Sequence, residues 1–244
     1  MYLVIDIGNT RTKAGLFEGG ALRAHAEWTG LPTEHILEWA YNHPIAAALL
    51  SSSGDTAEAL EAALRVRSPT RRLDHTLRLP FVNDYMTPAT LGRDRMAGVA
   101  GAAALYPGQN CLVIDAGTCI TFDVLTAEGR YPGGNISPGV RMRLRAMHEQ
   151  TARLPLVAPE AADAGLLGVS TETALRKGDQ LSAILEIEAF LARCEALYPG
   201  LRVLLTGGDA SLLLPHLKPQ IFALPHLVLH GLHEILRLNV DSEN

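Results

Sequence analysis

An apolar strand that ends in aspartate, any residue, glycine and a polar residue occurs twice in this chain. The first copy spans Leu3–Thr10 and the second spans Leu112–Thr118. In each copy a carboxylate stands where a buried strand stops, and the following glycine lets backbone N–H groups approach an anion closely. Hydroxyl side chains beside the glycine can donate to phosphate oxygens. The repeat therefore predicts two related halves with a phosphate-binding cleft between them, in which both turns grip one nucleotide.

Composition narrows the class of partner. The 244 residues are 48% hydrophobic and 19% charged, which supplies enough apolar material for one large or two small buried cores. The formal charge is −5, whereas domains whose main task is to neutralise nucleic-acid phosphates are usually strongly basic. The negative net charge favours a small-molecule or protein partner and argues against nucleic acid.

Thiols and hydropathy indicate the location. Cys111, Cys119 and Cys194 form no C-x-x-C pair and leave an odd thiol, which fits a reducing compartment better than a disulfide framework. Asp6 interrupts the first apolar run and no basic segment precedes it, so we expect no signal peptide. No uncharged stretch approaches the roughly 20 residues that a membrane-spanning helix needs. The sequence thus predicts a cytoplasmic protein with no membrane partner.

Hydrophobic periodicity predicts an α/β order in the first half, in which the first phosphate turn lies in a β-hairpin. The expected strands cover residues 2–6, 12–18, 21–28 and 45–50, and the expected helices cover residues 33–42, 55–66 and 93–106. Asp55 is a candidate cap for the second of these helices, because Glu58 follows it by three residues. Pro107 and Gly108 end the alanine-rich third helix.

The second half repeats this order of elements, which favours duplication over coincidence. We expect strands over 111–115, 118–125 and 202–206, a turn region over 129–134, helices over 141–151 and 171–197, and a loop over 156–168. The boundary near the end of the alanine-rich helix divides the chain into an N-terminal domain, residues 1–109, and a C-terminal domain, residues 110–244.

The first phosphate motif combines several groups that act in phosphoryl transfer by positioning and by charge stabilisation. They are the carboxylate of Asp6, the turn at Gly8, the donors Asn9 and Thr10, and the ammonium of Lys13. A plain hairpin turn with a solvated lysine explains the same residues equally well when this motif is taken alone. The second copy shifts the balance toward phosphate binding.

In the second half, two further segments suit a nucleotide. Thr118 follows Gly117 in the second copy of the repeat and offers a hydroxyl. Gly207 and Gly208 lie between an apolar strand and a helix, where adjacent glycines let the backbone pass close to a base or ribose. An ordinary βα turn capped by Asp209 is the alternative for this last segment. Neither a Walker loop nor a G-x-G-x-x-G segment opening a helix is present in the sequence.

These three motifs, in this order and spacing, resemble the phosphate-1, phosphate-2 and adenosine motifs of the actin-like ATPase superfamily. The whole chain more specifically resembles the type III pantothenate kinases. The resemblance also covers residues 85–95 (YMTPATLGRDR), 133–139 (GGNISPG) and 151–155 (TARLP). It implies duplicated actin-like, ribonuclease H-like domains of the α/β class with an ATP cleft between them. It also implies ATP-dependent phosphorylation of the primary hydroxyl of pantothenate, the first step toward coenzyme A.

The segment Gly92-Arg93-Asp94-Arg95 distinguishes among members of the superfamily. An acidic residue between arginines, just before a helix, can take a proton from a hydroxyl while a guanidinium holds a substrate carboxylate. For an isolated tetrapeptide, capping of the helix by Asp94 is the simpler explanation. The resemblance implies instead that Asp94 is the general base and that Arg95, with the Gly92 and Arg93 backbone, holds the pantoate end. It also implies that Tyr85 lines this pocket.

The resemblance further implies a homodimer and two cations. Thr171 matches a threonine that closes the pantothenate pocket from the neighbouring protomer, although Ser170 stands where the family usually has asparagine. Asp115 matches the residue that binds a monovalent cation, potassium or ammonium. Asp6 would serve Mg²⁺ through the phosphates. Cys119 replaces a small apolar residue in the second phosphate motif, with little expected effect.

Two other functions are kept as alternatives. A non-catalytic ATP-binding regulator would use the same fold, and proteins of this family have been named as accessory factors for transcription; the presence of Asp94 favours the enzyme. A kinase for another small hydroxylated acid is the second alternative. His226, His230 and His233 have helical spacing without acidic or cysteine partners nearby, so we expect a helix rather than a metal site.

Overall fold

The computed structural model describes residues 1–52, 57–160, 166–217 and 220–240. The chain forms two compact units. The first contains Met1–Gly108, Glu128–Pro132 and His226–Asn244, and the second contains Gln109–Ala127 and Gly133–Pro225. The last helix, which the sequence-based division placed in the second half, therefore has its contacts in the first unit.

The first unit is built on a five-stranded mixed sheet with the order β3-β2-β1-β4-β5. Its strands are β1 (Tyr2–Ile7), β2 (Arg11–Glu18), β3 (Ala21–Thr29), β4 (Ala47–Ser52) and β5 (Thr70–Arg72), and its helices are α1 (Thr33–Tyr41), α2 (Glu58–Arg65), α3 (Arg93–Leu105) and α7 (Leu227–Val240), with a 3₁₀ turn η2 (Pro88–Thr90). The expected strands and helices of this half are present, with shifted ends, and β4 pairs parallel to β1. The candidate cap Asp55 lies outside the described residues.

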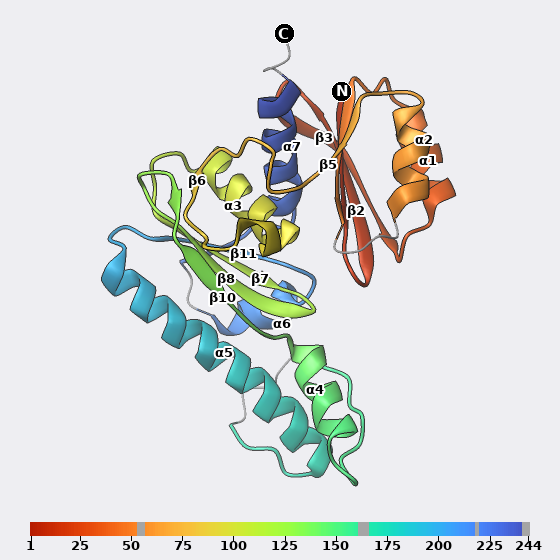
Figure 1. Cartoon of the computed structure of the whole chain (residues 1–244). Coiled ribbons are helices and arrows are strands. Elements are labelled where there is room, and N and C mark those ends of the chain that lie inside the picture. Colours follow the sequence, from red (N-terminus) through yellow and green to blue (C-terminus); the bar gives the residue numbers. More distant parts are fainter. Residues whose placement is uncertain (53–56, 161–165, 218–219, 241–244) are drawn as a thin grey trace. The chain divides into compact units, whose positions relative to one another are not determined.

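The side chains of β1 point alternately to the two faces of the sheet, and this explains which helices cover each face. Leu3 and Ile5 are fully buried in a core that includes Ile36 of α1 and Leu60 of α2. Val4 and Asp6 lie on the opposite face, because successive strand side chains point to opposite faces. Figure 1 shows α1 and α2 on one side of the first sheet and α7 on the other. Asp6 therefore lies on the α7 side of the sheet.

Helices α3 and α7 pack closely through glycine. A Cβ atom built on Gly231 would lie 1.7 Å from the carbonyl oxygen of Ala97, and one built on Gly101 would lie 2.3 Å from the carbonyl oxygen of Leu227. On the sheet side of α7, the ring of His233 stacks on Phe17 with centroids 4.3 Å apart. The glycines thus let α7 lie between α3 and the sheet without steric conflict.

The second unit repeats the strand order, as β10-β8-β7-β11-β12. Its strands are β7 (Cys111–Ala116), β8 (Cys119–Leu125), β10 (Gly133–Pro138), β11 (Arg202–Thr206) and β12 (Ile221–Ala223), and its helices are α4 (Val140–Glu149), α5 (Thr171–Leu197) and α6 (Ala210–Leu213), with a 3₁₀ turn η3 (Leu214–His216). The long helix α5 spans the residues that the sequence predicted and begins with a capping box between Ser170 and Thr173. The equal strand orders show a duplicated topology.

The short segment between β8 and β10, Glu128–Pro132, belongs to the first unit. The sequence predicted a turn region over 129–134, but Arg130–Tyr131 forms strand β9, which pairs in parallel with β6 (Val82–Asn83). Glycine and proline around β9 lower its strand propensity, so the pairing depends on contacts distant in sequence. The bidentate ion pair of Arg130 with Asp84, with Nε 2.8 Å from Oδ2, reinforces it.

Candidate active site

The first phosphate turn connects β1 to β2 and is open to solvent. Gly8, Asn9 and Thr10 are all exposed. The Gly8 N–H donates to the carbonyl oxygen of Arg11 at 3.0 Å, and a Cβ atom on Gly8 would lie 3.2 Å from that oxygen. The turn is therefore tight and keeps its backbone accessible. Thr12 behind it is buried and donates to the Gly30 carbonyl at 2.5 Å, which anchors the hairpin.

Asp6 and Asp94 place two carboxylates near each other at the end of β1. Burial first, and then the negative charge of Asp94, raise the pKa of Asp6 from 3.8 to about 6. Ser51, which hydrogen-bonds the Asp6 side chain, and Lys13, which lies opposite Asp6 in the β1–β2 register, act in the other direction. Asp94 itself is exposed. Paired carboxylates with an accessible member fit a bound cation and a polar substrate.

The first turn of α3 positions Asp94. Gly92 is the N-cap residue and makes no side-chain cap, so Asp94 is not the cap that the isolated tetrapeptide suggested. The Asp94 carboxylate accepts from the N–H of Arg95 at 2.9 Å, and a Cβ atom on Gly92 would lie 2.6 Å from that same carboxylate oxygen. Arg93 donates to the carbonyl of Ser52 at the end of β4. Glycine at position 92 therefore leaves room for the Asp94 side chain.

Arg95 is held among aromatic side chains. It is only 5% exposed, and its Nη2 donates to the hydroxyl of Tyr131 at 2.9 Å. Its guanidinium carbon lies 5.5 Å from the ring centroid of Tyr85. Sequence reasoning selected Tyr85 but missed Tyr131 and also Ser51, because neither lies in a motif. The register that places Ser51 beside Asp6 is visible only in the folded sheet, where β1 and β4 pair in parallel.

In the second unit, the second phosphate motif and the adenosine motif meet. Thr206 lies opposite Asp115 in the parallel β7–β11 register. Gly207 has a φ of +98°, and a Cβ atom there would lie 2.3 Å from the carbonyl oxygen of Ala116 and 2.5 Å from the Asp115 carboxylate. A Cβ atom on Gly208 would meet nothing within 4 Å. Gly207 thus serves close backbone packing, and Gly208 leaves the backbone accessible.

The residues where the second phosphate motif meets the adenosine motif form defined hydrogen bonds and an ion pair. Thr118 is exposed, and its carbonyl accepts from the Gly139 N–H at 3.1 Å. Asp209 occupies the N-cap position of α6 without making a side-chain cap; instead its carboxylate lies 3.2 Å from Nε of Arg141, and its N–H donates to Ala116. The alternative of an ordinary turn capped by Asp209 is therefore wrong in its hydrogen bonding.

Thr171 begins α5 at an exposed position and lines a cavity of about 340 Å³ within the second unit. The other lining residues are Met147, Leu154, Ala174, Leu175, Gly178 and Asp179. None of them belongs to the phosphate or adenosine motifs. This wall is mostly apolar, apart from Thr171 and Asp179.

Asp179 is a buried carboxyl among the residues that line this cavity. It is 4% exposed, and within the described part of the chain neither carboxylate oxygen has a hydrogen-bond partner. Burial raises its pKa from 3.8 to about 7; the charge of Arg143 opposes this rise and that of Asp209 adds to it. Since the folded pKa lies above the unfolded one, folding takes up a proton between these values, and stability falls as pH rises toward 7.

We therefore expect Asp179→Asn to stabilise the protein at pH 8 by roughly 1–3 kcal/mol, because a buried charge is removed. At pH 4 the difference should be small, since the native carboxyl is then protonated. Urea unfolding at both pH values measures the effect. Glu172→Gln, an exposed substitution on the same helix, should leave the pH dependence unchanged. Equal destabilisation of Asp179→Asn at both pH values would contradict this account.

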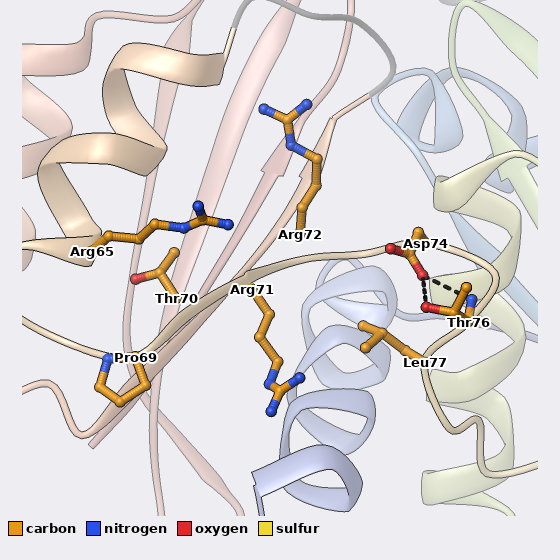
Figure 2. A pocket seen from close by; sticks show the side chains of 8 residues that line it. All are labelled: Arg65, Pro69, Thr70, Arg71, Arg72, Asp74, Thr76 and Leu77. Carbon is orange, nitrogen blue, oxygen red and sulfur yellow. Dashed lines mark hydrogen bonds between the residues drawn. The ribbon is translucent and has the colours of Figure 1, made fainter.

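A second cavity, of about 490 Å³, lies beside β5 in the first unit. Arginines dominate its lining, yet Arg65 and Arg72 both form ion pairs with Glu61. Figure 2 shows the guanidinium groups of Arg71 and Arg72 on opposite sides of the strand. Because Glu61 already neutralises Arg65 and Arg72, and no motif residue lines this cavity, it is not the nucleotide site.

The histidines of α7 behave as packing residues. Burial lowers the pKa of His230 and His233, and both rings contact Phe17. Across the described ranges, no group of three or more histidine, cysteine or acidic residues is arranged to hold a metal ion. In the same part of the chain, no helix is long and apolar enough to cross a membrane.

Comparison with known proteins adds to this geometry. The sequence profile of the type III pantothenate kinases matches residues 2–193. The type III pantothenate kinase of Bacteroides fragilis is 41% identical over 240 residues, covering 98% of each chain. Among solved structures, a protein named as a Baf family transcriptional activator from Campylobacter jejuni aligns with a TM-score of 0.64 at 19% identity, covering 98% of this chain and 99% of that one.

A protein named as a 2-dehydro-3-deoxygalactonokinase from Sinorhizobium meliloti aligns with a TM-score of 0.59 at 16% identity, covering 97% of this chain and 98% of that one. At such identities these two structures show the fold alone. Together with the equal strand orders of the two sheets, they confirm the predicted duplicated actin-like fold. The profile match and the identity across nearly the whole chain show more: this protein belongs to the type III pantothenate kinase family.

Proposed function

We propose that this pantothenate kinase uses Asp94 as its general base and Asp6 as the carboxylate that serves Mg²⁺. The enzyme phosphorylates the primary hydroxyl of pantothenate with ATP, the first step of coenzyme A biosynthesis. The observation that carries the assignment is the placement of these two carboxylates near each other, Asp6 partly buried and Asp94 exposed. An accessible carboxylate on a fixed helical turn can accept the hydroxyl proton as the oxygen attacks.

In the first unit, we assign phosphate binding to the solvent-exposed turn between β1 and β2. Gly8, Asn9 and Thr10 offer backbone and side-chain donors to phosphate oxygens, and Lys13 adds a positive charge. When bound, ATP supplies the phosphoryl group and Mg²⁺ offsets its charge. The raised pKa of Asp6, caused partly by Asp94, supports a cation there, because a positive charge would relieve the repulsion between the two carboxylates.

The second unit contributes Thr118, Gly207 and Gly208 to the nucleotide. Thr118 is exposed, so its hydroxyl is accessible to a phosphate oxygen. The open space at the Cβ position of Gly208 supports close approach of a flat ligand to the backbone. A side chain at that position would occupy this space.

The pantothenate residues lie around the first turn of α3. Arg95 is oriented by Tyr131 and lies beside the ring of Tyr85. We assign its guanidinium to the oxygen atoms at the pantoate end of the substrate, with the Gly92 and Arg93 backbone completing the binding surface. Tyr85, which is partly buried, would form a wall of the same site.

Asp115 is the proposed ligand of a monovalent cation, potassium or ammonium. It is partly buried at the end of β7, with the hydroxyl residues Thr121 and Thr206 opposite it in the two neighbouring strands. Oxygen atoms of this kind are the ligands that hard cations prefer. The close approach of the Gly207 backbone to the Asp115 carboxylate supports a compact site.

The test is ADP release with ATP, Mg²⁺ and pantothenate in potassium and in sodium buffer, for the wild type and Asp115→Asn. We expect pantothenate-dependent turnover that needs potassium in the wild type, and low turnover equal in both buffers for the variant. A variant that keeps its potassium response would exclude Asp115 as the cation ligand. Nucleotide binding without turnover would favour a regulator, and turnover only with other hydroxy acids would replace the substrate.

A homodimer and a cytoplasmic location complete the proposal. The exposure of Thr171 at the start of α5 supports its contact with a second protomer, where it would close that protomer's pantothenate pocket. Cys111, Cys119 and Cys194 are free thiols, which supports a reducing compartment such as the cytoplasm.

A further inference from the structure

Arg95 is a buried cation whose side chain needs fixed acceptors. An arginine that is 5% exposed loses most of its hydration, and such a charge is costly unless hydrogen bonds replace the lost water. Nη2 donates to the Tyr131 hydroxyl at 2.9 Å. A phenol accepts this bond without cancelling the positive charge, so the guanidinium remains a strong donor toward a ligand.

Tyr131 is held rigidly by both its backbone and its ring. Its carbonyl accepts from the Asp84 N–H at 3.1 Å within the β6–β9 pair. The ring is completely buried, packs edge-on against Phe81 at 5.9 Å, and stacks on Tyr85 at 6.0 Å with an interplanar angle of 21°. The hydroxyl that meets Arg95 therefore has a fixed position.

We propose that Tyr131 is a positioning residue for pantothenate binding. Its hydroxyl fixes the plane of the Arg95 guanidinium in the orientation that meets the substrate. The inference rests on the proposed role of Arg95, which Tyr131 serves without touching pantothenate. Tyr85 limits the position of the guanidinium on another side, with 5.5 Å between the guanidinium carbon and its ring centroid. The planar fork of arginine makes such orientation decisive, because its donors point in fixed directions.

Tyr131→Phe tests this role, because it removes one hydroxyl and keeps the ring that packs on Phe81 and Tyr85. We expect the KM for pantothenate to rise about 10-fold, which corresponds to the loss of one charge-assisted hydrogen bond. The kcat and the KM for ATP should change less than about twofold, since the base and the nucleotide residues are untouched. A purely structural role would instead lower thermal stability and leave the KM for pantothenate unchanged.

A matched control is Tyr41→Phe. The Tyr41 hydroxyl also donates one hydrogen bond, a partly buried one to the Ala63 carbonyl at 2.9 Å, but on the α1–α2 side of the sheet. This variant loses the same atom and should keep the wild-type KM for both substrates. An equal rise in the KM for pantothenate in both variants would overturn the inference, because it would show a general effect on the first unit.

Arg95→Lys distinguishes the positioning role of Tyr131 from the pantothenate-binding role of Arg95. If Arg95→Lys leaves the KM for pantothenate unchanged, the proposed role of Arg95 fails. If Arg95→Lys raises this KM and Tyr131→Phe does not, the role of Arg95 stands and only the positioning inference fails. In the Arg95→Lys background, Tyr131→Phe should add nothing, because the hydroxyl acts through the guanidinium. Multiplying effects in the double variant would show independent action and overturn the inference.

Discussion

Asp94→Asn is expected to lower kcat about 10²- to 10⁴-fold, the range by which a positioned general base accelerates proton transfer. Asparagine has nearly the same shape as aspartate but cannot accept the hydroxyl proton. The site should survive otherwise, because an amide oxygen can still accept from the Arg95 N–H that now bonds Asp94. ADP release at saturating ATP and pantothenate measures the loss.

The binding of ATP should persist in this variant, which isothermal titration with a non-hydrolysable analogue can check. Asp74→Asn is the matched control: Asp74 is an aspartate of the same unit that bonds Thr76 beside the second cavity, away from the motifs. It should retain wild-type kcat. If Asp94→Asn keeps more than a tenth of the wild-type kcat, another group accepts the proton and the assignment of the base is wrong.

Gly231→Ala is expected to destabilise the protein by about 3 kcal/mol, the upper end of the usual cost of overpacking. The added methyl group would lie 1.7 Å from the Ala97 carbonyl oxygen and 2.7 Å from the Gly101 nitrogen. Both are backbone atoms of α3, so no side-chain rotation can relieve the overlap, and the two helices must separate. Urea unfolding followed by circular dichroism gives the change in the free energy of unfolding.

Gly178→Ala makes the same chemical change in the middle of another helix, α5, where a Cβ atom meets nothing within 4 Å. Helix propensity alone should then stabilise the protein, by up to about 1 kcal/mol. The pair of variants thus has opposite expected signs. Similar effects of both substitutions would show that the packing of α3 on α7 does not decide the cost at Gly231.

Local patterns were enough to predict most of the elements and the phosphate turns. The helix over 171–197 was predicted with its observed ends, and its buried apolar residues recur at helical spacing. The two Asp-x-Gly turns could be found because each follows a strand with an uninterrupted apolar run. Such signals lie within a few residues of one another, which is the range that sequence periodicity covers.

Features that depend on distant contacts were not predictable in this way. Tyr131 lies in a segment whose glycines and proline suggest a turn, and only its pairing with β6 places it beside Arg95. The burial of Asp179 depends on how α4 and α5 pack. The contacts of α7 with the first sheet likewise join residues at opposite ends of the chain. None of these arrangements leaves a periodic signal in the sequence.

The membership of α7 in the first unit has a consequence for protein synthesis. Strands β1 and β2 leave the ribosome early, but α7 follows the whole second unit in the chain. The face that carries Phe17 therefore lacks its covering helix until translation has passed residue 240, whereas every segment of the second unit has been made by then. A chain that stops short would expose this apolar face, which makes the unfinished product a target for chaperones and proteases.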